Sequence, residues 1–143
     1  MLYEAESGDI RMAFTGETLL SQGLTMFREE RFLRMRDLLR GADVAFTNAE
    51  VLFHNYEDPP AYLAGTYMRC DPRFIDHLQW LGINLVACAN NHTYDFGEGG
   101  ISTNMRYLDE AGLAHAGTGR NLAEATAPTY LDTPNGRVAL ISA

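Results

Sequence analysis

The sequence predicts an α/β domain built around a mostly parallel sheet, and three features indicate this class. Short apolar runs alternate along the chain with longer segments in which apolar residues recur at helical spacing. Glycines, or an Asp-Pro pair, mark the boundaries between these segments. The resulting order is strand, helix, strand, helix, strand, helix, strand and then a hairpin, and such alternation is typical of a parallel sheet covered by helices.

The first third of the chain supplies two strands and a helix. Residues 10–14 alternate loosely between apolar and polar side chains, which predicts a short strand that ends before Gly16. The segment 24–40 carries apolar residues at helical spacing with Arg and Glu between them, and Gly41 is a suitable stop. Residues 44–47 form an apolar run that we interpret as a buried strand.

The middle third begins with an irregular loop over residues 53–65, which contains acidic residues and two consecutive prolines. Asp71 and Pro72 then predict a helix start, because Asp caps unpaired backbone N–H groups and Pro fits the first helical position. That helix ends at Gly82, and residues 84–89 follow it as a third buried strand.

The last third holds a long helix, a short strand and a hairpin. The helical stripe ends at Gly112, and residues 113–116 form the strand. Asn121, with Glu three residues later, predicts the capped start of a brief helix. Two strands over 128–133 and 137–141 flank an Asn-Gly pair, which is a strong hairpin signal.

Composition and charge narrow the class of protein. Hydrophobic residues make up 46% of the chain and charged residues 21%, which is typical of one globular domain over residues 1–143 and not of disorder. The net charge of −8 argues against nucleic acid as a partner, because phosphate binding needs clustered Lys and Arg. The same carboxylates are suited to a hard divalent cation.

Cysteine use and hydropathy bear on the compartment. The two cysteines, Cys70 and Cys88, indicate neither a Cys-x-x-Cys pair nor a disulfide framework, which favours a reducing compartment. No apolar run reaches the length of a membrane span, and residues 1–9 lack the basic and apolar regions of a signal peptide. We therefore expect a cytoplasmic chain with no membrane segment among these residues.

Polar residues follow three of the predicted strands at the point where each strand ends. Glu17 follows the first strand, Glu50 the second, and Asn91 with His92 the third. Because the carboxyl ends of parallel strands meet at one edge of a sheet, these side chains should converge there. Oxygen donors from Glu17, Glu50 and Asn91 suit two divalent ions such as Mn, Fe or Zn, and we expect Glu50 to bridge them.

His92 and Asp95 are the predicted catalytic residues. His92 lies beside the expected metal ligands and can protonate a leaving oxygen. Asp95, three residues further along, can orient its imidazole ring. Simpler interpretations stay open, with Glu17 and Glu50 as solvated acids at strand ends, Asn90 and Asn91 as turn formers, His92 as a hydrogen-bonded loop residue and Asp95 as a cap.

Two residues are predicted to bind substrate. Arg120 ends a Gly-x-Gly-Arg stretch that can form a small anion-binding loop, with its guanidinium as a clamp for phosphate or carboxylate. Asn48, two residues before Glu50, is the other residue predicted to bind substrate. A plain turn is the simpler interpretation of the glycine-rich stretch. We expect His54 at the surface and His77 on the solvated side of its helix.

The ordered motifs of the chain are Asn48-Ala49-Glu50, Ala89-Asn90-Asn91-His92 with Asp95 and Gly97, residues 108–112, and residues 117–121 with Glu124, Ala125 and Pro128. In this order they resemble the CapA family of bacterial capsule and poly-γ-glutamate synthesis proteins, which belongs with the calcineurin-like metallophosphoesterases. The resemblance implies the amino-terminal half of a four-layer α/β/β/α sandwich, with βαβ units and a final hairpin. The missing half-domain, or a second chain, would supply further histidine-bearing loops.

For the site, the resemblance implies that Glu50 is a bridging ligand, Asn91 a ligand and His92 the acid-base residue. One position departs from the family pattern, because Gly16-Glu17 stands where the family has Gly-Asp. The longer side chain shifts a bound cation by about one methylene. The resemblance also allows for membrane-associated members of the family.

These observations predict a metal-dependent enzyme of hydrolase type that acts on an anionic small molecule, a peptide or polyglutamate. A metal-dependent peptide epimerase on the same fold is one alternative, because a cation that polarises a carbonyl also assists removal of an α-proton. A non-catalytic partner in capsular polymer synthesis is the other, since a fold alone does not define an activity.

Overall fold

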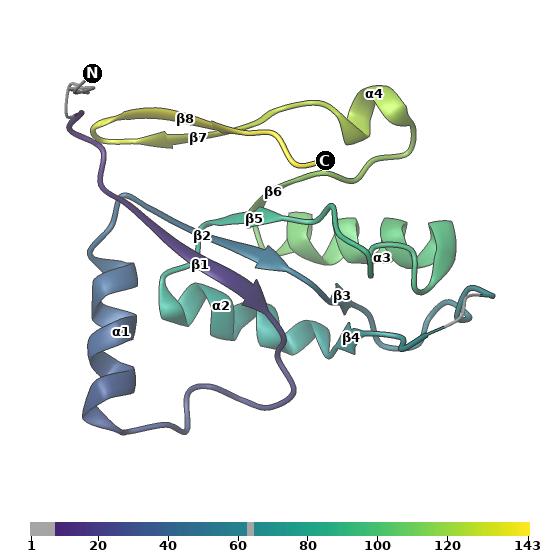
Figure 1. The fold of residues 1–143 in the computed structure, drawn as a ribbon, viewed down its shortest axis with the longest axis horizontal. Helices are drawn as coiled ribbons and strands as arrows, with labels where there is room; N and C mark the ends of the chain where they lie inside the picture. The colour runs from purple at the N-terminus through teal and green to yellow at the C-terminus, as the bar shows by residue number, and fades with distance from the viewer. Residues whose placement is uncertain (1–7, 63–64) are drawn as a thin grey trace, which may run out of the picture.

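The computed structural model describes residues 8–62 and 65–143 and has an α/β fold (Figure 1). Its main sheet has four strands in the order β1-β2-β5-β6, and every neighbouring pair is parallel. This arrangement confirms the predicted class, an α/β fold with a mostly parallel sheet. The four strands are β1 (Met12–Thr18), β2 (Val44–Ala49), β5 (Leu85–Ala87) and β6 (Ala114–Ala116).

Helices make the crossovers that parallel strands require, and in Figure 1 the three longest of them lie below the main sheet. Their buried leucines pack with Ala45 of β2 and Val86 of β5 in one core. Burial of one leucine stabilises the fold by about 1.5–3 kcal/mol. The helices are α1 (Glu30–Arg40), α2 (Ile75–Leu81, preceded by the 3-10 turn η1, Pro72–Phe74), α3 (Gly97–Glu110) and the short α4 (Leu122–Ala125).

A second strand pair flanks the segment that we predicted as a loop. β3 (Leu52–Phe53) and β4 (Arg69–Cys70) lie near its two ends and pair in parallel. Two-residue strands leave no periodicity for a sequence pattern to reveal. Residues 63–64 of the predicted loop lie outside the described residues, as do residues 1–7 of the polar start.

The predicted hairpin is present. β7 (Thr129–Thr133) and β8 (Gly136–Leu140) pair antiparallel, and Figure 1 shows them on the side of the main sheet opposite α1 and α2. The turn residues are Pro134 and Asn135, one position earlier than the Asn-Gly pair that we predicted. Gly136 belongs to β8 and has a φ of 141°, a conformation that glycine adopts without a Cβ clash.

Three of the predicted helix boundaries are confirmed by cap geometry. The carboxylate of Asp71 accepts a hydrogen bond from the N–H of Arg73 at 3.1 Å, at the start of η1. Gly82 ends α2 in the left-handed conformation, with a φ of 102°. Asn121 accepts from the N–H of Glu124 at 3.1 Å and so caps α4.

α1 is shorter than the predicted helix over 24–40, because the segment before Glu30 is held by α2. The N–H of Leu24 donates to Nδ1 of His77 at 2.8 Å. The ring of Phe74 packs edge-on against the same imidazole, with centroids 5.0 Å apart. The expectation that His77 is solvated was therefore wrong, and this contact between distant segments has no signature in local spacing.

Asp43 connects the hairpin to the main sheet. Its Oδ2 accepts from the N–H of Arg11 at 2.7 Å, and its Oδ1 accepts from Nδ2 of Asn135 at 3.1 Å. These two hydrogen bonds, that from Arg11 above all, hold the pKa of Asp43 below its ordinary value of 3.8. The ionised carboxylate is therefore the form that the folded state prefers.

Asp43→Asn is expected to lower the urea midpoint of unfolding slightly at neutral pH and to lose this effect in acid. Because the pKa is lowered in the folded state, the stabilisation is present above 3.8 and disappears as the pH falls through the folded-state pKa. Urea unfolding of both proteins over this pH range measures it. Asp9→Asn, at an exposed position, is the control, and a difference that persists unchanged in acid would contradict the electrostatic explanation.

Candidate functional site

A β-bulge in β1 sets the position of Glu17. β1 and β2 pair regularly up to Phe14, beyond which the register shifts and Glu17 lies opposite Asn48. The hydroxyls of Thr15 and Thr47 each donate to a backbone carbonyl of the other strand at 3.1 Å. An irregularity of this kind redirects the side chains that follow it, so Glu17 belongs to a strand longer than the one we predicted.

Glu50 follows β2 and interacts with Glu17 and His92. Partial burial is the main reason that the pKa of Glu50 is raised above its ordinary value of 4.5. The like charge of Glu17 and a hydrogen bond with it raise the pKa further, whereas the charge of His92 opposes the rise. The structure thus brings three of the predicted site residues together at the carboxyl edge of the sheet.

The loop after β5 is held by its own side chains. Oγ1 of Thr93 donates to the carbonyl of Cys88 at 2.6 Å and accepts from the N–H of Asn90 at 2.9 Å. Oδ1 of Asn90 accepts from the N–H of His92 at 2.9 Å. The turn-forming interpretation therefore holds for Asn90. Asn91 is exposed, and within the part of the chain that the structure describes its side chain makes no hydrogen bond.

His92 and Asp95 are in direct contact, as the sequence spacing suggested. Nδ1 of His92 lies 2.9 Å from Oδ2 of Asp95. The Asp95 carboxylate is buried and also accepts from the N–H of Met68, while its backbone carbonyl accepts from Ala61 at 2.9 Å. A carboxylate on Nδ1 fixes the orientation of the ring and leaves Nε2 for a substrate.

A hollow of about 580 Å³ opens beside this pair. One wall comes from the segment just before β4, which Asp95 anchors through its bond with Met68. Sequence reasoning missed this wall, because it follows the predicted loop over residues 53–65 and no local pattern indicates its contact with Asp95. The lining residues are Gly65, Thr66, Tyr67, Met68, Asn91, His92 and Asp95.

His54 is fully buried, so the surface position that we expected for it was wrong. Its ring stacks on Phe96 with centroids 4.5 Å apart. The N–H groups of Tyr56 and Asp58 each lie 3.0 Å from one of its ring nitrogens. Asp58 in turn accepts from the hydroxyl of Thr103 on α3 at 2.8 Å. His54 is therefore an anchor of the loop.

The two predicted substrate-binding residues lie in different places. The guanidinium of Arg120 makes three bonds with the carboxylate of Glu124, at 2.6 to 3.1 Å, and lines a different hollow from the one beside His92. Asn48 lies at the carboxyl edge, with its Oδ1 3.3 Å from Nδ2 of Asn90. A part for either residue in substrate binding stays a prediction.

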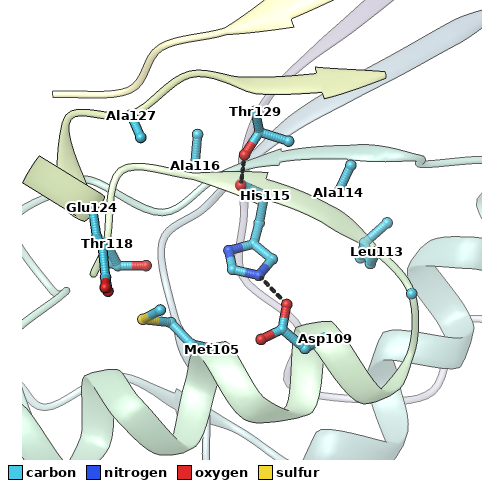
Figure 2. A pocket seen from close by; sticks show the side chains of 11 residues that line it. Met105, Asp109, Leu113, Ala114, His115, Ala116, Thr118, Glu124, Ala127 and Thr129 are labelled. Carbon is cyan, nitrogen blue, oxygen red and sulfur yellow. Dashed lines mark hydrogen bonds and ion pairs between the residues drawn. The ribbon is translucent and has the colours of Figure 1, made fainter. Parts of the chain in front are cut away.

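A second hollow, of about 460 Å³, lies between α3, β6 and α4 (Figure 2). Nε2 of His115 lies 3.1 Å from Oδ1 of Asp109, and Thr129 donates to the carbonyl of His115. Nδ1 of His115 and Oγ1 of Thr118 are buried and have no partner among the described residues. Ordered water commonly satisfies such groups, and this hollow contains none of the predicted site residues.

The donor set at the carboxyl edge fits part of a metal site. Among residues 8–62 and 65–143, no group of three or more His, Cys, Asp and Glu side chains is arranged to hold an ion. The predicted set is two carboxylates and an amide, from Glu17, Glu50 and Asn91, and its oxygens suit a hard or borderline divalent ion. Such an ion needs further ligands, so metal binding stays a prediction.

The chain is an α/β domain with a candidate site at the ends of its parallel strands. At that edge lie two interacting carboxylates and a histidine whose ring contacts an aspartate. The family model for the bacterial capsule synthesis protein PGA_cap matches residues 8–143. The chain belongs to this family. The match agrees with the resemblance to CapA proteins that the motifs indicate.

Two relatives come from Sinorhizobium fredii (strain NBRC 101917 / NGR234), namely "Uncharacterized protein y4uA" and "Uncharacterized protein y4sH". Each is 37% identical to this chain over 135 residues, which is 92% of this chain and 29% of the relative. The chain therefore spans less than a third of the length of these curated relatives. In the described residues, no helix is both long and apolar enough to cross a membrane.

Proposed function

We propose that this chain supplies part of a divalent-metal site in a hydrolase-type enzyme of capsule-polymer metabolism. The observation that carries the proposal is the convergence of Glu17, Glu50 and His92 at the carboxyl edge of the main sheet. Membership of the capsule synthesis family supports the biological setting. A carboxylate-bearing peptide or poly-γ-glutamate is the substrate class that fits both the site and the family.

Glu17, Glu50 and Asn91 are the residues that would hold the ions, with Glu50 between two of them. The carboxylates of Glu17 and Glu50 repel each other, and a cation bound to both would offset this repulsion. Mn, Fe or Zn held by these residues would supply an activated water and polarise the bond to be cleaved. The remaining ligands would come from another part of the protein or from a second chain.

His92 would act as the proton donor to the leaving atom. Its Nδ1 faces the buried carboxylate of Asp95 at 2.9 Å, so the ring is held in a fixed orientation. Nε2 is then the atom that meets the substrate. General acid catalysis of this kind contributes about 10²–10⁴-fold to the rate.

The hollow beside His92 would hold the substrate. Tyr67 and Met68 give it apolar surface, and Thr66 adds a hydroxyl group. Asn48 and Arg120 are the further proposed contacts. Arg120 lines a different hollow, so it would contact only a substrate that extends beyond the hollow beside His92, and its guanidinium would first have to leave Glu124.

Metal analysis and a turnover assay test this function in the protein expressed at the full length that its gene encodes. We expect bound Mn, Fe or Zn after purification and cleavage of a generic phosphoester or a γ-glutamyl peptide that Mn²⁺ stimulates and EDTA abolishes. Exchange of an α-proton with solvent, without cleavage, would indicate the epimerase instead. Protein that binds no metal would contradict the proposal and favour a non-catalytic role in polymer synthesis.

A further inference from the structure

Asn90 joins two strand ends at the proposed site. Its Nδ2 donates to the carbonyl of Ala49 at 2.8 Å and lies 3.3 Å from Oδ1 of Asn48. Its Oδ1 accepts from the N–H of His92 at 2.9 Å. One side-chain amide therefore connects the end of β2, one residue before Glu50, to the loop that carries His92.

This connection lies where the pairing of the two strands ends. The register of β2 and β5 stops with Asn48 opposite Ala87, where β5 ends, and β2 continues for one more residue, Ala49, which pairs with Thr18 of β1. Asn90 is half-buried, so its hydrogen bonds are partly shielded from competing water. The amide is therefore a direct side-chain restraint on the separation of Glu50 and His92, in addition to the bonds that Thr93 makes within the loop and the pairing of Ala49 with Thr18.

We propose that Asn90 is a positioning residue of the site, whose amide sets the distance between Glu50 and the Asn91-His92 pair. Its own polar atoms are occupied within the chain, so it acts through its neighbours and not as a metal ligand. The effect on metal binding rests on the proposed function. The effect on the metal-free protein does not, and it can be measured separately.

Asn84 provides a matched control, because it makes the same kind of bridge at the opposite end of the same strands. Its Oδ1 accepts from the N–H of Ala45 at 2.9 Å, and its Nδ2 donates to the carbonyl of Asp43 at 3.0 Å. Asn84 is also half-buried. Asn84→Ala removes comparable hydrogen bonds at the amino-terminal ends of β2 and β5 and leaves the carboxyl edge of the sheet unchanged.

The first measurement uses the metal-free protein. In amide hydrogen exchange, Asn90→Ala is expected to speed exchange of the His92 N–H about tenfold, the effect of losing one hydrogen bond, and to shift the amide resonance of Glu50. Asn84→Ala is expected to lower the unfolding midpoint to a similar extent and to leave both signals unchanged. Unchanged His92 exchange and Glu50 resonance in Asn90→Ala would overturn the inference.

The second measurement is a Mn²⁺ titration that detects the free ion by electron paramagnetic resonance. Asn90→Ala is expected to weaken Mn²⁺ binding about 10- to 100-fold, as loss of a residue that orients ligands does, and Asn84→Ala to weaken it less than about twofold. Equal effects of the two variants would overturn the inference and leave the proposed function standing. A wild type that binds no Mn²⁺ would contradict the proposed function, and the metal-free measurement then decides the inference alone.

Asn90→Asp covers the case in which Asn90→Ala does not fold. It keeps the oxygen that accepts from His92 and replaces the Nδ2 donor by an oxygen that faces the carbonyl of Ala49. Slow exchange at His92 should persist while the Glu50 resonance shifts, and Asn84→Asp is the matched variant. An unchanged Glu50 resonance in Asn90→Asp would overturn the proposed restraint on β2.

Discussion

Glu50→Gln is expected to weaken Mn²⁺ binding by about 100-fold while leaving the metal-free protein at least as stable as the wild type. Glutamine keeps the shape of the side chain but removes the charge that a bridging ligand contributes. In the metal-free protein, partial burial and the like charge of Glu17 raise the pKa of Glu50. The ionised form therefore lowers stability at pH values above the ordinary 4.5, and a neutral amide removes that cost.

A Mn²⁺ titration and urea unfolding in EDTA measure the two halves of this prediction. Glu30→Gln is the control, because Glu30 is an exposed glutamate of α1 paired with Arg34, and its loss should not affect Mn²⁺ binding. Wild-type affinity in Glu50→Gln would show that the carboxylate is not a ligand. A large loss of stability in EDTA would show that Glu50 is a structural residue.

His92→Ala is expected to reduce turnover about 10²–10⁴-fold and to leave the bound metal largely in place. The imidazole is oriented by Asp95 and lies next to the proposed ligands without belonging to them. Removing it deletes the proton donor but no ligand. The hydrolysis assay with metal-loaded protein, together with metal analysis of the same sample, measures both quantities.

Asn91→Ala is the comparison that makes the roles separable. Its exposed amide is a proposed ligand, so its loss should lower the metal content, and turnover should recover partly when excess Mn²⁺ is added. His92→Ala should show no such recovery. Equal loss of metal in the two variants would contradict the assignment of His92 as a proton donor beside the metals.

Local chemistry was enough to predict most of the secondary structure. The caps at Asp71 and Asn121 and the stop at Gly82 are where the sequence indicated them, because a cap depends on a few consecutive residues. The start of α1 was predicted too early, because the N–H of Leu24 bonds to His77. That partner is 53 residues away, and no local pattern contains it.

The candidate site was predictable in outline for a similar reason. Parallel strands end at one edge, so polar residues after three strands had to lie near one another once the strand order was right. The spacing of His92 and Asp95 also anticipated their contact. The bulge that brings Glu17 opposite Asn48, and the wall that Met68 forms, depend on register and on loop packing.

The amino-acid sequence by itself determined the alternation of strands and helices, the helix ends and the residues gathered at the carboxyl edge of the sheet. These follow from hydrophobic period, capping and chain direction, which neighbouring residues set. Only the tertiary structure decided the burial of His54, the bulge before Glu17 and the bridge that Asn90 makes between β2 and the loop after β5. Each of these is a contact between segments far apart in the chain, and its energy depends on a geometry that exists only once the sheet has formed.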